Sequence, residues 1–188
     1  TRYIGDWSSD VCSSDLSGSF DPQVAALRAV HRCVSDNARG YPPSDVPVAV
    51  ESYSQDLAAD DVVAVLDGLK IDRAHLVGVS MGAAAALQVA IRHPRRVRSA
   101  VLASIGTGSD AKPEELQAQM ENMAKLIESQ GLENLALSMA NQPARKKLRE
   151  KNPAELEKFM AELKGLSTLG MANTMRGVQK RQIGRAHV

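Results

Sequence analysis

The arrangement of apolar and polar residues changes character at Ser80. The apolar, β-branched stretch at residues 75–79 predicts a short buried strand, and the alanine-rich stretch at residues 83–91 predicts a helix. Gly78 and Gly82 flank the serine two residues away on each side, where a side chain would collide with neighbouring backbone as the chain reverses. The pattern therefore predicts a sharp turn that lifts the Ser80 hydroxyl off a sheet and holds Ser80 at a positive φ.

Further strands and helices are predicted on both sides of this turn. Residues 30–34 and 99–103 are apolar and read as strands. Ser52 and Gln55 have the spacing of a capping box, in which the serine caps a helix and the glutamine reaches back to it, and they predict a helix to about Leu69. Strands that alternate with helices indicate a parallel sheet with helices on both faces.

After the last of these strands the pattern becomes purely helical. Residues 105–110 form a polar link that contains glycine, and a helix is predicted over residues 113–130 because proline suits a first turn. Gly131 then interrupts it, and breaks that contain proline follow. We therefore expect an α/β unit over residues 17–110 and a helical unit over residues 111–181.

Three motifs, in order along the chain, resemble those of one family. Residues 78–82 match Gly-x-Ser-x-Gly, a turn that carries a nucleophilic serine, and residues 92–97 contain the His-Pro-x-Arg-Val sequence that ends the helix after it. Residues 37–45 are similar to Asp-x-Arg-Gly-x-Gly-x-Ser-Asp, with Asn37 in place of the commoner Asp and a proline in place of the second Gly. Together they resemble the α/β-hydrolase family.

The resemblance implies a partial α/β-hydrolase fold followed by an all-helical cap subdomain over the active site. In the strand order of the family, residues 30–34, 75–79 and 99–103 would be the fourth, fifth and sixth strands. The third strand, which lies between the fourth and fifth, would precede this sequence. We expect its absence to leave a gap or to force the fourth and fifth strands to pair.

The resemblance also implies acyl transfer to water. Ser80 would be the nucleophile that attacks an ester, thioester or related small apolar carbonyl compound. The backbone N–H of Met81, at the start of the predicted helix, would donate to the developing oxyanion. The second donor would lie in a loop upstream of this sequence, and no cofactor and no metal are implied.

A serine hydroxyl is a weak nucleophile until a base accepts its proton, and we expect that base to be missing. In the family the catalytic histidine, and usually the acid, follow the cap, beyond the residues present here. His31 and His75 fall in predicted strands and His93 at the far end of a helix, so none is expected to reach Ser80. Asp110 follows the sixth strand, where a minority of the family carry the acid. This chain alone is therefore expected to be inactive.

The two ends of the chain are related at the level of DNA. The bases GAC GTG TGC TCT TCC GAT CT encode residues 10–16, and their reverse complement contains ATC GGA AGA GCA CAC GTC, which encodes residues 183–188. That DNA resembles a widely used sequencing-library adapter. We therefore expect residues 1–16 and 182–188, with His187, to be translated adapter sequence that makes few contacts with the core.

Without these ends the chain has nearly balanced charge. They hold two of the 23 Lys and Arg residues and three of the 22 Asp and Glu residues, which leaves an excess of two positive charges. That balance does not indicate a nucleic acid partner. Cys33 is then the only cysteine, which excludes a disulfide and a cysteine metal site and favours a small buried residue over a reactive thiol. With no apolar run of about eighteen residues and no signal-peptide pattern, we expect no membrane association and, by default, a cytoplasmic location.

Six of the seven methionines lie in the expected cap: Met120, Met123, Met139, Met160, Met171 and Met175. Methionine adapts to irregular apolar ligands, so this enrichment suggests an apolar substrate pocket, although ordinary helix packing is the better explanation for any single one. The basic residues 145–147 are expected to form a solvated helix face.

Other functions fit the same residues. A non-catalytic relative of the hydrolases could bind a ligand through the same fold, and residues 112–181 could form an independent helical interaction module, although they show no fixed repeat. Among enzymes of the family, an esterase competes with a carbon–carbon bond hydrolase, a lactonase, a haloperoxidase-like enzyme and an acyltransferase.

Overall fold

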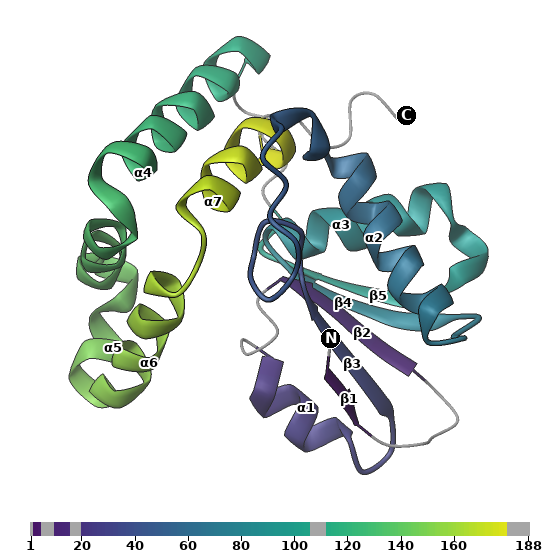
Figure 1. Cartoon of the computed structure of the whole chain (residues 1–188). Helices are drawn as coiled ribbons and strands as arrows, with labels where there is room; N and C mark the ends of the chain where they lie inside the picture. The colour runs from purple at the N-terminus through teal and green to yellow at the C-terminus, as the bar shows by residue number, and fades with distance from the viewer. Residues whose placement is uncertain (1, 5–9, 16–19, 106–111, 180–188) are drawn as a thin grey trace.

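A computed structural model describes residues 2–4, 10–15, 20–105 and 112–179 of the chain. For residues 2–4 and 10–15 only the course of the backbone is described. Figure 1 shows an α/β layer with its sheet at the centre, and a group of helices that lies beside the carboxyl ends of the strands. A mainly parallel sheet with helices on its faces, followed by a helical cap, is the arrangement predicted from the sequence.

The described sheet has five strands in the order β1-β3-β2-β4-β5. The strands are β1 (Arg2–Ile4), β2 (Asp10–Asp15), β3 (Arg32–Asn37), β4 (Ala74–Val79) and β5 (Val97–Ala103). Every neighbouring pair is parallel except β1 with β3, which is antiparallel. The predicted strand over residues 30–34 therefore lies two to three residues too early, because Val30 belongs to a turn and is 59% exposed.

β2 overturns two expectations about the N-terminal end. Residues 10–15 lie between β3 and β4, in the position expected to stay empty, and pair in parallel with both strands. The expectation of few core contacts is therefore wrong for their backbone. The N–H and C=O groups that face each other across a gap between two strands need partners, and an extended backbone supplies these whatever its side chains are. The adapter origin of these residues remains a prediction.

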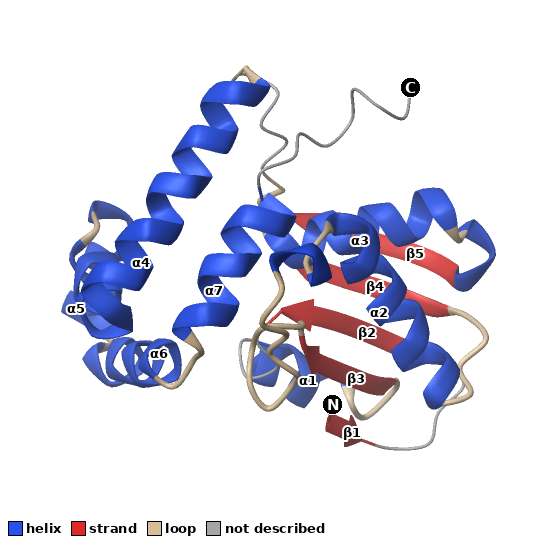
Figure 2. Cartoon of the chain, turned by 45° about the horizontal axis from the view of Figure 1, so that its top comes forward, coloured by secondary structure: helices blue, strands red, loops and turns tan. Residues whose placement is uncertain are grey.

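Helices cover both faces of the sheet. The helical elements of this layer are α1 (Asp21–Leu27), η2 (Val50–Ser52), α2 (Gln55–Gly68), α3 (Met81–Arg92) and η3 (Pro94–Arg96). Figure 2 shows α2 and α3 on one face of the sheet and α1 on the other. The core between the sheet and α2 and α3 contains Val34, Leu76, Leu66 and Val89, all at most 2% exposed. This packing fixes β4 and α3, and hence the turn between them.

The start of α2 differs from the prediction. Ser54, rather than Ser52, is the N-cap, and its hydroxyl accepts a hydrogen bond from the N–H of Leu57 at 3.1 Å. Ser52 instead ends the short 3₁₀ turn η2. Gln55 does not complete a capping box, because its side chain is buried and donates to the carbonyl of Val178 at 3.2 Å. A tertiary contact has replaced the local one.

The cap consists of helices alone within the described residues. Its elements are α4 (Pro113–Asn141), η4 (Pro143–Arg145), α5 (Lys146–Lys151), α6 (Pro153–Lys164), α7 (Thr168–Thr174) and the short π-helical turn η5 (Met175–Gln179). α4 is not continuous, because Gly131 has φ 75° and ψ 171° and divides it where the sequence predicted a break. No described helix has the length and apolarity needed to cross a membrane.

α7 and η5 dock closely on the loop that follows β3. A β-carbon on Gly170 would overlap the backbone of Gly40, and one on Gly177 would overlap Tyr53. The Asn173 amide also donates to the carbonyl of Val48 at 3.1 Å. Two backbones can approach this closely only where a glycine lacks a side chain. α7 and η5 therefore pack directly on the core. This docking argues against an independent helical module at residues 112–181.

Candidate active site

Ser80 lies at the junction of β4 and α3, where the sequence predicted a sharp turn. It has φ 53° and ψ −112°, which confirms the predicted positive φ, and it is the N-cap residue of α3. Its own N–H donates to the carbonyl of Ala103 in β5 at 2.9 Å. Its side chain is exposed. A serine held at this backbone angle is strained by about 1–3 kcal/mol, so the surrounding structure must hold it there.

The two glycines around Ser80 make the turn possible. A β-carbon on Gly78 would overlap the backbone of Gly82 and Ala83. The strand and the helix therefore touch at their backbones directly behind the serine. The Gly-x-Ser-x-Gly pattern has a steric cause here, and any larger residue at Gly78 would push α3 away from β4.

The N-terminus of α3 lies at the turn that carries Ser80. Met81 is the first residue of α3, and its N–H therefore has no carbonyl four residues back within the helix to bind. The aligned peptide dipoles of a helix add a partial positive charge at this end, which favours a developing negative charge. These properties suit an oxyanion donor, and the assignment of that role to Met81 is part of the proposal below.

An apolar cluster joins the cap to the core beside Ser80. Met81 and Ala38 from the α/β layer pack against cap residues, as does the buried Tyr41. The cap contributes Ile127, Leu132, Leu135, Ala136, Met139, Phe159, Met160, Leu163, Leu166, Met171 and Met175. Four of the six cap methionines are among these, whereas Met120 is not and Met123 is 39% exposed. The cluster that includes Met81, the neighbour of Ser80, is therefore apolar and rich in adaptable side chains.

The expectation that residues 145–147 form only a solvated face is wrong for Arg145. Its guanidinium lies 4.4 Å from the centre of the Phe159 ring, and its Nη1 donates to the carbonyl of Met139 at 3.3 Å. Both partners belong to the apolar cluster. Arg145 therefore closes the outer side of the cluster with a cation–π contact, which a charge pattern along the sequence does not reveal.

The loop at residues 37–45 is held by an ion pair that sequence reasoning missed. The Arg39 guanidinium donates to both carboxylate oxygens of Asp61 on α2, at 2.5 and 2.6 Å, and also to the carbonyl of Ser52 at 2.6 Å. The hydrogen bonds to Asp61 raise the pKa of Arg39. The Ser44 hydroxyl closes the loop by donating to the carbonyl of Asn37 at 2.6 Å.

This network has a structural role near the site. It fixes the loop so that Ala38 and Tyr41 face the apolar cluster. A cavity of about 530 Å³ lies between the loop and α2, lined by Asp36, Arg39, Asp45, Asp61 and neighbouring residues. The arginine in the motif could have been singled out from the sequence, but its partner could not, because Asp61 is 22 residues away.

The described histidines lie far from Ser80, as expected. His75 precedes Ser80 by five residues on an extended strand, which puts their backbones about 16 Å apart. His31 lies beside it, with the ring centres 6.3 Å apart. His93 follows the twelve-residue α3, about 18 Å from the start of that helix. Asp110 and His187 lie outside the described residues.

Cys33 matches its predicted character. It is 2% exposed and free, and burial raises the pKa of its thiol. A buried thiol that resists ionisation is a poor nucleophile. Cys33 is therefore a packing residue of β3.

Comparison with known proteins identifies the family. Residues 13–170 match the family model of the alpha/beta hydrolase fold, which covers most of the chain, so the chain belongs to that family. It is 30% identical over 166 residues to 3-oxoadipate enol-lactonase 1 of Acinetobacter baylyi, an alignment that covers 88% of this chain and 59% of that protein.

Two further proteins show how far the likeness extends. The chain is 42% identical over 81 residues to 2-hydroxymuconate semialdehyde hydrolase of Pseudomonas sp. strain CF600, covering 43% of this chain and 27% of that protein. A hydrolase from Pseudomonas aeruginosa PA01 has a similar structure, with a TM-score of 0.78, 25% identity and coverage of 97% of this chain and 68% of that one. The chain thus aligns with 59% of the enol-lactonase and 27% of the semialdehyde hydrolase, which is less than two thirds of the length of either relative.

Proposed function

We propose that the protein to which this chain belongs is a serine hydrolase that uses Ser80 as its nucleophile. The observation that carries the proposal is the backbone of Ser80, held at φ 53° between a buried strand and a helix N-terminus with its side chain exposed. Strain of this kind persists only where the surrounding structure enforces it, and it is concentrated at active sites. Membership of the family and the hydrolase relatives support the same reaction class.

The reaction would proceed by acyl transfer. The Ser80 oxygen forms a bond to the substrate carbonyl carbon while its proton passes to a base, and the Met81 N–H donates to the carbonyl oxygen as that oxygen gains negative charge. Collapse of this intermediate expels the leaving group, which takes up the proton. Water then attacks the acyl-enzyme by the same route and releases the acid. The base would come from the longer protein, since the described histidines lie far from Ser80.

The substrate would be a small apolar ester or lactone. The apolar cluster of cap residues beside Met81 supports an apolar acyl group, and its methionines suit an irregular shape. A cyclic ester is favoured because the relative that aligns with 88% of the chain is named an enol-lactonase.

A second candidate is the hydrolysis of a carbon–carbon bond next to a ketone. It is supported by the 42% identity to 2-hydroxymuconate semialdehyde hydrolase, although that alignment spans only 43% of the chain. A lactone and a β-diketone probe distinguish the two, because hydrolysis of the second requires a carbon leaving group.

The test compares this chain with a protein extended to the length of its relatives. The extended protein should hydrolyse p-nitrophenyl acetate and a small lactone, and Ser80→Ala should lower kcat by about a millionfold, to the background rate. The 188-residue chain should show no turnover that depends on Ser80. An extended, folded protein whose turnover survives Ser80→Ala would refute the proposal, and one without any turnover would favour the non-catalytic alternative.

A further inference from the structure

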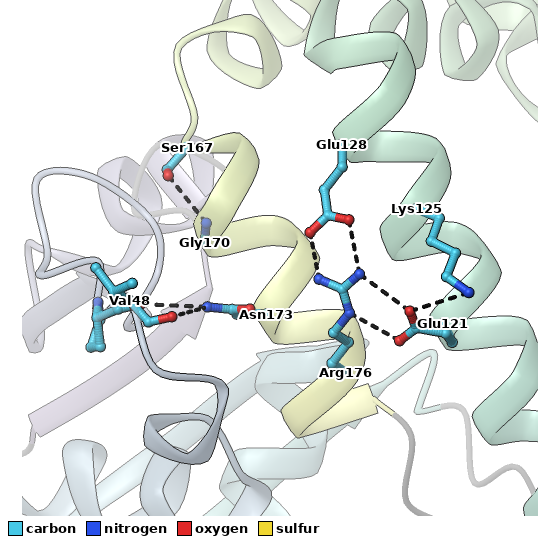
Figure 3. Close-up of polar contacts among 9 residues, drawn as sticks. Val48, Glu121, Lys125, Glu128, Ser167, Gly170, Asn173 and Arg176 are labelled. Atoms are coloured by element: carbon cyan, nitrogen blue, oxygen red, sulfur yellow. Dashed lines mark hydrogen bonds and ion pairs between the residues drawn. The ribbon is translucent and has the colours of Figure 1, made fainter.

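Arg176 connects the docked part of the cap to its long helix. It lies in η5, next to Gly177, which packs on Tyr53 of the core. From there its side chain reaches across to α4, as Figure 3 shows. All three guanidinium nitrogens donate to carboxylates. Nε binds Glu121 at 2.9 Å, Nη2 binds Glu128 at 2.8 Å and Glu121 at 3.3 Å, and Nη1 binds the other oxygen of Glu128.

The two carboxylates define one stripe of α4. Glu121 and Glu128 are seven residues apart, which is two turns of helix and a rise of about 10 Å. Ala124 and Ile127 lie between them in sequence and are buried, Ile127 within the apolar cluster. Through Ile127, the position of this half of the helix therefore sets whether one side of the cluster is covered.

The same half of α4 has a break at its other end. Gly131 leaves the helical conformation, and a β-carbon at this residue would have no neighbour within 4 Å. The helix here has neither a continuous hydrogen-bond ladder nor side-chain packing to stiffen it. Residues 113–130 can therefore change angle against residues 132–141 with little loss of packing at the break.

We propose that Arg176 is a latch and Gly131 a hinge for residues 113–130, and that this half-helix uncovers the apolar cluster when the latch is released. A cavity of about 310 Å³ lined by Val50, Gln117, Glu121 and Arg176 lies at the latch, between the half-helix and η2. Outward movement of the half-helix widens this opening. The inference concerns the cap alone, so its failure would leave the proposed role of Ser80 untouched.

The geometry exceeds that of an ordinary surface ion pair. Exposed pairs contribute little because water solvates both partners. The two glutamates here are 40% exposed, but the guanidinium is only 23% exposed and donates to both oxygens of each carboxylate. Four of its five N–H groups donate to these carboxylates, whose two negative charges disfavour binding of an anionic ligand there. Lys125 also forms an ion pair with Glu121, at 3.7 Å, but both residues belong to α4. This pair therefore does not connect two elements, as the Arg176 contacts do.

Hydrogen–deuterium exchange of the full chain, followed by mass spectrometry, tests the latch. Arg176→Gln should raise exchange of the amides of residues 117–130 by about tenfold and leave α6 and β4 unchanged. It should also increase binding of the neutral dye Nile red, which reports an uncovered apolar surface. Lys125→Gln, the matched control, should change neither signal. Arg176→Lys should give an intermediate effect, because an ammonium keeps the charge but cannot form bidentate hydrogen bonds to both carboxylates.

Removal of the acidic partners separates a latch from general stabilisation. Glu121→Gln with Glu128→Gln should reproduce the effect of Arg176→Gln, and all three changes together should add nothing further, because they remove one interaction. If Arg176→Gln does not fold, this double variant provides the test in its place. Unchanged exchange in residues 117–130 would overturn the proposal. So would a rise spread evenly over cap and sheet, a rise that continues past residue 131, or an equal effect of Lys125→Gln.

Discussion

Gly170 of the cap lies so close to the backbone of Gly40 in the core that a β-carbon on Gly170 would overlap it. A β-carbon on Gly40 would itself come within 2.8 Å of the Tyr53 ring. This contact sets the distance between α7 and the loop after β3. The position of the cap on the core is therefore sensitive to the addition of a single methyl group at Gly170.

Gly170→Ala should therefore loosen the cap. The added methyl must displace backbone, which costs about 1–3 kcal/mol, and thermal unfolding should shift down by several degrees. Gly165→Ala is the matched control, because its β-carbon would make only ordinary contacts, at 3.4 Å or more, and its φ of −76° suits alanine. Equal melting temperatures for the two variants would show that the Gly40–Gly170 contact does not carry the docking.

Ser80→Gly should stabilise the fold while it removes the proposed nucleophile. Relief of about 1–3 kcal/mol of backbone strain outweighs the 0.5–1 kcal/mol or so that glycine costs through the unfolded chain. Ser104 has φ 51°, so Ser104→Gly should stabilise to a similar extent. In the extended protein, only Ser80→Gly should abolish turnover. A Ser80→Gly variant that melts below the parent chain would contradict the strain argument.

The interaction of Arg176 with Glu121 and Glu128 should weaken at acidic pH. Hydrogen bonds from Arg176 hold the pKa of both Glu121 and Glu128 below the ordinary value. A carboxylate with a lowered folded-state pKa contributes stability that is complete above its unfolded pKa of about 4.3 and is lost as the pH falls through the folded value. The exchange difference between the parent chain and Arg176→Gln should thus be full at pH 6 and shrink below pH 4. A difference that stays constant to pH 3 would exclude the carboxylates as its source.

Deletion of residues 1–16 should cost far more stability than deletion of residues 1–9. The longer deletion removes β2, which pairs with β3 on one side and β4 on the other, whereas the shorter one removes only the edge strand β1. Loss of a central strand leaves two ladders of unpaired backbone groups. Circular dichroism during urea titration should show cooperative unfolding for the shorter deletion and none for the longer. Equal transitions would show that β2 does not support the sheet.

The parts of this fold that depend on local pattern could be predicted from the sequence. The turn at Ser80 has its own steric signature in Gly78 and Gly82, and the break at Gly131 follows from a residue that tolerates positive φ. Strand ends were less accurate, since hydrophobicity at Val30 does not distinguish a turn from a strand. The N-cap of α2 was misplaced by two residues because Gln55 meets a partner 123 residues away.

The interactions that could not be predicted join residues distant in sequence. Asp61 pairs with Arg39, Phe159 lies under Arg145, and two glutamates of α4 meet Arg176. Each of these charged residues looks like an ordinary solvated side chain until the fold brings its partner close. The base expected for Ser80 is a different case, since the described residues place no histidine beside it and the family likeness alone cannot assign one.

The place of β2 in the sheet has a consequence for how this fold could be engineered. The slot between β3 and β4 is filled by main-chain pairing, from Asp10 to Asp15 on the β3 side and from Asp10 to Ser13 on the β4 side. It is in effect a receptor for an extended peptide. A split version of the protein, with residues 1–16 supplied as a separate peptide, should reassemble by strand complementation and report that binding through its restored fold.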